Sequence, residues 1–209
     1  MAVQPESLPG INITLLYDML PLERLDRNRL RGIFKDPLLT VMDTPELVVM
    51  FAPTRSLVAQ FGDKRVRLTD QGQHLVEQTN LAELAAQVDK AIQGSKLAAY
   101  GFNFETALAL NDDQTPASML KARFLPDEEQ IALLVGGQIE IMAPRLVFWR
   151  GATRYDLFFE PDPKQLKAHV NVHFETDTLP GAKALQESMR AEHELFATTL
   201  VGLFSGIRP

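Results

Sequence analysis

The chain has 209 residues, of which 45% are hydrophobic and 23% charged, with a net charge of -6 and no cysteine. This composition is typical of a soluble globular protein that buries a substantial core, and it excludes disulfides, thiolate metal sites and a cysteine nucleophile. The negative charge disfavours extensive nucleic-acid binding, which depends on neutralising phosphates with Lys and Arg.

No apolar run approaches the roughly 20 residues that a membrane-spanning helix needs. Residues 1–7 lack the basic and apolar segments of a secretory signal. A chain without cysteine is also compatible with a reducing compartment. We therefore expect a cytoplasmic location and no association with membranes.

The first half of the chain predicts a strand, a helix, three or four strands and a second helix. Residues 10–17 alternate apolar and polar side chains, as a half-buried strand does. A helix is expected from Pro21 to the Asp36–Pro37 pair, which ends it. Further strands are expected at 47–51, 57–61, 65–68 and, with the weakest pattern, 74–78. Helical spacing from Leu81 to Ile92 predicts the second helix.

The second half predicts the same order of elements. Residues 98–108 form the first strand, and Thr115–Pro116 provides a favourable N-cap and first turn for a helix that Pro126 ends. Residues 127–136 form a short helix or turn. Four strands then follow, at 138–143, 146–150, 154–160 and 169–175. A long helix is expected from about Gly181 to Phe204.

Three segments recur at nearly the same offset, which predicts an internal duplication. Residues 51–68 match 142–157 once Thr54 and Arg55 are skipped, because Ala, Pro, Leu, Val, Gly, Arg and Leu then coincide. The two other matches pair residues 10–13 with 101–104 and residues 30–34 with 120–124. We therefore expect a first repeat at 1–95 and a second at 96–209, packed together as one globular unit.

The duplication also predicts that Gly62 and Gly151 occupy equivalent hairpin turns, where glycine accommodates a positive φ. The predicted fold class is α+β: a tandem pseudo-two-fold repeat of β-α-β4-α units, mainly antiparallel sheet, with helices on one face. This order of elements resembles the duplicated fold of the TATA-binding protein in topology, although no motif of that family is present. The resemblance implies nucleic-acid binding through the sheet, with phosphates contacted by Arg65, Arg67, Arg145, Arg150 and Arg154.

A strictly alternating stretch near the C-terminal end carries two of the four histidines. His169, Asn171, His173 and Glu175 alternate with Val170, Val172 and Phe174, which predicts the polar face of a half-buried strand. A shared metal ion is not expected, because residues four apart on a strand lie about 13 Å from each other, whereas zinc ligands lie about 2 Å from the ion. We predict no metal site and no cofactor.

No familiar catalytic motif occurs in the chain. The Walker loop, the dinucleotide fingerprint, the nucleophile elbow and HExxH are all absent. His193 lies between two glutamates on the last predicted helix, where adjacent residues do not face one another. If the protein were an enzyme, His173 with Glu175 would be the first residues to test.

The segment from Leu146 to Trp149, with Phe158 and Phe159, is apolar at consecutive positions, whereas a strand half exposed to water should alternate. Three interpretations remain open. Both faces could be covered within the chain, by a helix and by the loop at 161–168. The segment could instead form a subunit interface or a hydrophobic ligand groove.

These observations favour a non-enzymatic binding or assembly protein, whose partner is another protein or a second copy of itself. The expected binding surface is the sheet face or the second-half apolar strands, with these candidate residues: Arg150, Trp149, Phe158, His169, Asn171, His173 and Glu175. The alternatives are a nucleic-acid-binding protein that uses the sheet, and an enzyme without a recognisable motif.

Overall fold

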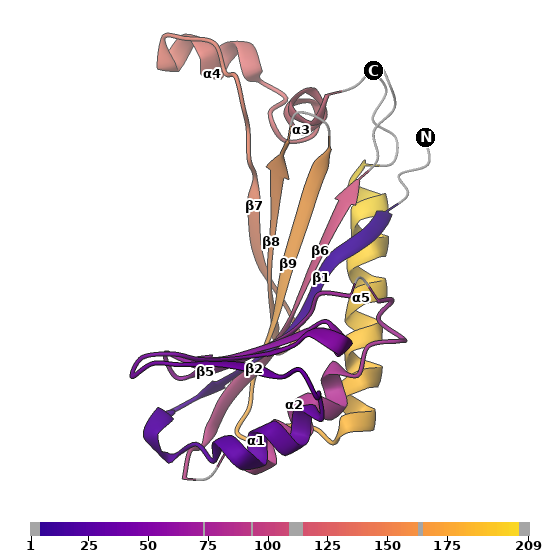
Figure 1. Ribbon diagram of the computed structural model, residues 1–209. Helices are drawn as coiled ribbons and strands as arrows, with labels where there is room; N and C mark the ends of the chain where they lie inside the picture. The colour runs from indigo at the N-terminus through magenta and orange to yellow at the C-terminus, as the bar shows by residue number, and fades with distance from the viewer. Residues whose placement is uncertain (1–4, 73, 93, 109–114, 163–164, 205–209) are drawn as a thin grey trace.

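The computed structural model describes residues 5–72, 74–92, 94–108, 115–162 and 165–204. In this part of the chain the fold is α+β, with five α-helices and one nine-stranded sheet in the order β2-β3-β4-β5-β1-β6-β9-β8-β7 (Figure 1). Every pair of neighbouring strands is antiparallel.

The strands fall into two groups that meet at the centre of the sheet. The first group contains β1 (Pro5–Tyr17), β2 (Thr40–Asp43), β3 (Val48–Ala52), β4 (Leu57–Gly62) and β5 (Arg65–Asp70). The second contains β6 (Leu97–Leu108), β7 (Arg145–Arg150), β8 (Thr153–Pro161) and β9 (Leu166–Glu175). The long strands β1 and β6 pair with each other and join the two groups into one continuous sheet.

The helices are α1 (Arg27–Phe34), α2 (Leu81–Ala91), α3 (Pro116–Phe124), α4 (Glu128–Val135) and α5 (Ala182–Phe204). Figure 1 shows α1, α2 and α5 on one side of the sheet, while α3 and α4 lie near one end of the second group. The prediction that the helices lie on one face of the sheet therefore holds for α1, α2 and α5.

The core lies between the sheet and these helices, because alternate strand residues point towards the helical side. Ile13 and Leu15 of β1, Phe102 and Phe104 of β6, and Phe34 of α1 are all buried. Phe104 stacks against Phe196 of α5, with ring centroids 6.4 Å apart. Apart from Ala99, the buried apolar residues of the described chain form one cluster that spans both strand groups.

The sheet is strongly twisted, so that β2–β5 lie across the direction of β6–β9 (Figure 1). Gly101, on the central strand β6, allows a close approach of its neighbour: a Cβ there would lie 2.5 Å from the backbone oxygen of Val172. The side away from α1, α2 and α5 is hollowed, because residues of β4, β5, β1, β6, β8 and β9 line one depression.

Several strand predictions were wrong. Residues 74–78 form no strand and contain a turn at 76–78. The carboxylate of Asp70 accepts hydrogen bonds from the Gly72 N–H and the Thr79 hydroxyl and contacts the His74 ring, at 2.7–3.0 Å. Residues 138–143 have no regular structure. In contrast, β2 was not expected, and α1 is shorter than predicted because a separate 3₁₀ turn occupies Leu22–Arg24.

The predicted equivalence of the hairpins at 57–68 and 146–157 is also wrong. The first hairpin consists of β4 and β5 and lies beside β1, whereas the second consists of β7 and β8 and is separated from β6 by β9. The two hairpins nevertheless share a local form, in which two strands flank a two-residue turn.

The two glycines also serve different purposes. Gly151 has φ of 61° within its turn, but at the other hairpin Asp63 and Lys64 take the positive φ values and Gly62 ends β4. A Cβ at Gly62 would lie 2.8 Å from the backbone oxygen of Glu46. Glycine is therefore favoured at Gly151 by its backbone angle and required at Gly62 by a close approach.

Candidate binding face

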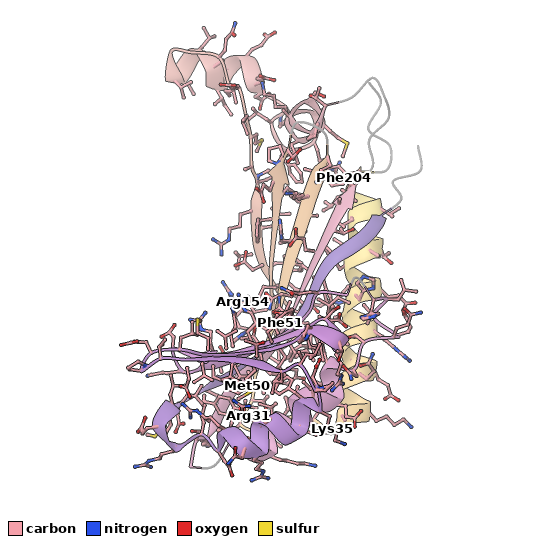
Figure 2. The ribbon with its side chains drawn as sticks, viewed as in Figure 1. Arg31, Lys35, Met50, Phe51, Arg154 and Phe204 are labelled. Carbon is pink, nitrogen blue, oxygen red and sulfur yellow. The ribbon has the colours of Figure 1, made fainter. Side chains whose placement is uncertain are left out.

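The candidate site is the sheet surface opposite α1, α2 and α5, which we call the open face. Directly opposed residues on neighbouring strands share a face, so the register assigns its members. Figure 2 illustrates the alternation on β3, where Met50 is buried on the helical side and Phe51 lies on the open face with 39% exposure.

A row of three asparagines crosses the centre of the open face. Asn12 of β1, Asn103 of β6 and Asn171 of β9 are direct cross-strand neighbours. The Asn171 side chain donates to Asn103 at 2.6 Å, and Asn103 donates to Asn12 at the same distance. The Asn12 side-chain N–H and the Asn171 carbonyl oxygen, at the ends of the row, make no hydrogen bond to a described residue, so both remain available to a ligand.

The row continues into the second strand group through an ion pair. Asp156, opposite Asn171, is buried, and its carboxylate accepts two hydrogen bonds from Arg145 at 2.5 and 2.7 Å. The hydrogen-bonded Arg145 guanidinium, opposed in part by desolvation, lowers the pKa of Asp156. The pair therefore remains charged at neutral pH and fixes β7 to β8.

His169 lies between two carboxylates on the open face. Its Nδ1 is 3.5 Å from Glu105 and its Nε2 is 3.5 Å from Glu160, while its ring stacks on Phe158 with centroids 4.5 Å apart. The Nε2 atom is buried and makes no hydrogen bond to a described residue.

Beside the asparagine row, a second row contains His173, Gly101, Thr14 and two arginines. Arg154 of β8 and Arg67 of β5 lie on either side of the central strands, and both belong to the open face. Neither arginine forms an ion pair with a described carboxylate. The asparagine row, Arg67, Glu105 and His169 together line a hollow of about 420 Å³.

Apolar side chains flank this polar centre on both sides. The patch of the first group contains Met42, Val49, Phe51 and Val58. The patch of the second contains Val147, Trp149 and Phe158, with exposures of 50%, 57% and 39%. The open face therefore has an apolar, polar, apolar sequence from one edge to the other.

Of the seven residues predicted from the sequence, six lie on the open face: Trp149, Phe158, His169, Asn171, His173 and Glu175. The expected polar face of the strand at 169–175 is confirmed. Arg150 does not belong with them, because it lies on the helical side next to α5. The five arginines proposed for phosphate contact are thus divided between the two faces.

Arg150 instead lines a small apolar pocket of about 140 Å³ between β7–β9 and α5. Within it the Tyr155 hydroxyl donates to Glu192 at 2.9 Å. Burial raises the pKa of Tyr155 to about 12, with a further contribution from Glu192. Burial also raises the pKa of Glu192, although the Tyr155 hydrogen bond and Arg150 partly oppose the change.

The interpretation that β7 is covered on both faces within the chain was wrong. Residues 166–168 belong to β9 itself, and Val147, Phe148 and Trp149 all remain exposed. The described residues contain no group of three or more His, Asp or Glu side chains that could hold a metal ion.

Sequence reasoning missed Asn12, Asn103 and Glu105 as members of the site, and it named Arg67 only for the nucleic-acid alternative. The paired asparagines at 12 and 103 stood in the repeated segments 10–13 and 101–104, so the duplication contained a signal for them.

No family model matches this chain, and no curated protein matches it either. Among the described helices, none is long and apolar enough to cross a membrane.

Proposed function

We propose that this protein is a non-enzymatic binding protein that holds an extended segment of a partner protein across its open face. The observation that supports the proposal is the order of surfaces on that face, where two apolar patches flank a central band of amides, hydroxyls and charges. An extended protein segment presents both kinds of group, because its side chains alternate beside backbone N–H and C=O groups.

The asparagine row supplies the polar part of this recognition. Asn12 offers a donor and Asn171 an acceptor, and these are the groups that pair with a backbone carbonyl and a backbone N–H. Arg67 and Arg154 can bind carboxylates of the partner. Glu105 and Glu160 lie on the same face and would repel phosphates, which favours a protein segment over nucleic acid.

The pairing of the central strands supports the further proposal that the halves 1–95 and 96–209 arose by duplication. The matched segments 10–13 and 101–104 lie antiparallel, with Asn12 opposite Asn103, Ile11 opposite Phe104 and Ile13 opposite Phe102. This is the relationship that a two-fold axis through the asparagine pair would produce. The hairpin match does not contribute to the proposal.

The proposal is tested by identifying proteins that co-purify with the chain and measuring each purified candidate by calorimetry. Asn103→Arg places a long cation in the centre of the open face. It should lower the affinity for a true partner at least tenfold. Lys183→Glu is the matched control, because Lys183 lies on α5 with a side chain that is 92% exposed. It should leave the affinity unchanged.

Equal binding to wild type and Asn103→Arg would show that the partner uses another surface and would overturn the proposal. The same two variants should be titrated with short DNA and RNA. Salt-dependent binding of nucleic acid that Asn103→Arg strengthens and Lys183→Glu leaves unchanged would replace the protein-binding function by the alternative.

A further inference from the structure

The outer edge of β7 is unpaired within the described part of the chain. β7 ends the sheet, and its central residues expose apolar side chains on both faces: Val147 and Trp149 on the open face and Phe148 on the other. An exposed edge of this kind is a template for pairing with another strand. A binding site on this edge goes beyond the proposed function, because that function concerns the open face of the sheet.

The two ends of the sheet differ in their protection. At the other end, β2 has only four residues, and Asp43 in it forms an ion pair with Arg27 of α1 at 2.9 Å. Short length and charge are the usual protections of an edge strand. Between its terminal arginines, β7 has neither a charge nor a proline.

The hydrogen-bond pattern shows which residues of β7 can accept a new strand. The Phe159 N–H donates to the Pro144 carbonyl at 3.1 Å, and Arg150 faces Thr153 across a two-residue turn. Hydrogen bonding alternates along an antiparallel strand, so Leu146 and Phe148 also bond to β8. Arg145, Val147 and Trp149 therefore direct their backbone N–H and C=O groups outward.

We infer that β7 pairs antiparallel with β7 of a second copy, around a two-fold axis at Val147. Outward-facing residues must oppose outward-facing residues, which excludes the register that would set Arg145 opposite Arg150. With Val147 opposite its own copy, Leu146 lies opposite Phe148 and Arg145 lies opposite Trp149. These are apolar pairs and a cation–π pair, so the strand is complementary to itself.

The neighbouring register, with Phe148 on the axis, also satisfies the backbone. It would set Leu146 opposite Arg150, however, and leave Arg145 opposite Gly151. The register centred on Val147 is therefore favoured. Exposed apolar residues also lie on α4 and on the segment that leads from it to β7, namely Ile131, Leu133, Leu134, Val135 and Ile141.

The test uses the absence of cysteine, which makes every introduced thiol unique. Val147→Cys should form an intermolecular disulfide under mild oxidation, because opposed Cα atoms in a hydrogen-bonded pair lie about 5.5 Å apart. Met42→Cys on β2 is the matched control, since Met42 is 51% exposed on the opposite edge. It should form no intermolecular disulfide under the same conditions.

Sedimentation of the untagged chain should give a dimer, and Val147→Pro should convert it to a monomer. Proline at this position removes only an outward N–H, so the β7–β8 ladder is preserved. If Val147→Pro fails to fold, Val147→Lys provides the same test through two opposed lysines. A wild-type chain that is monomeric at every concentration, or crosslinking through Met42→Cys as readily as through Val147→Cys, would overturn the inference. Asn103→Arg should leave the dimer intact, which separates this result from the proposed function.

Discussion

Gly101 of β6 lies so close to the backbone oxygen of Val172 that a Cβ at position 101 would be 2.5 Å from that oxygen. That distance is too short for any side-chain carbon, and the atom in contact is backbone, which cannot rotate away. The central strands can therefore approach as they do only with glycine at this position.

Gly101→Ala should lower the free energy of unfolding by about 1–3 kcal/mol, because the backbone must shift to relieve the contact. Gly10→Ala is the matched control on the neighbouring strand β1, where a new Cβ would meet nothing within 4 Å. That substitution should be neutral or slightly stabilising. Urea unfolding of both variants checks the prediction, and equal losses would contradict it.

Asn103→Ala should lower the free energy of unfolding by about 1 kcal/mol, because it removes both hydrogen bonds of the asparagine row. Thr69→Ala serves as the control, since Thr69 lies opposite Asn12 on the same face. Thr69→Ala should lower the free energy of unfolding by no more than about 0.5 kcal/mol. The row would have no structural role if the two variants unfolded at the same urea concentration.

The Arg145–Asp156 pair should stabilise the protein at neutral pH and lose its effect in acid. The folded pKa of Asp156 is lowered, chiefly by hydrogen bonding to Arg145. The contribution is therefore present above the unfolded pKa of about 4 and is lost as the pH falls through the folded pKa. Asp156→Asn should destabilise the chain at pH 7, and the difference from wild type should shrink towards about pH 3.

The exposed pair between Arg65 and Asp63 provides the control for this pH series, with side chains 46% and 82% exposed. Asp63→Asn should change stability little at any pH, because exposed pairs contribute little. If Asp63→Asn lowered the free energy of unfolding as much as Asp156→Asn, burial would not be what makes the Arg145–Asp156 pair stabilising.

Glu192→Gln should produce the opposite pH dependence. Burial raises the folded pKa of Glu192, so the contribution of this group is present below its unfolded pKa and is lost as the pH rises through the folded pKa. The variant should therefore be at least as stable as wild type at pH 7, where its amide oxygen can still accept from Tyr155. Unfolding measured from pH 4 to pH 8 should show a flatter profile for the variant than for wild type.

The elements that sequence predicted best are those whose pattern depends only on local spacing. Alternation located the strands that contain Ile13 and Val172, and helical spacing located α2 and α5. β2 was missed because its four residues do not alternate clearly. It forms because β3 offers an edge with which it can pair.

Only part of the candidate site could be predicted from the sequence, for a related reason. Alternation identified His169, Asn171 and His173 as one polar face, because all three belong to one strand. The neighbours of Asn171 across the sheet depend on strand order, which places Asn103 on one side and Asp156 on the other. No spacing within a single strand encodes that order. Arg150 is a different case, because it follows Trp149 directly on β7 and alternation alone places the two side chains on opposite faces.

The pairing of β1 with β6 has a consequence for synthesis of the chain on the ribosome. Asn12 is made about ninety residues before Asn103, its partner at the centre of the sheet. While the chain emerges, β5 can cover one edge of β1 as soon as residue 70 is available, but the other edge stays open until β6 appears. Contacts of such long sequence separation form slowly, and open edges attract other chains. The nascent first half thus carries its most aggregation-prone edge in the middle of the future sheet, and the arrival of the second half closes it.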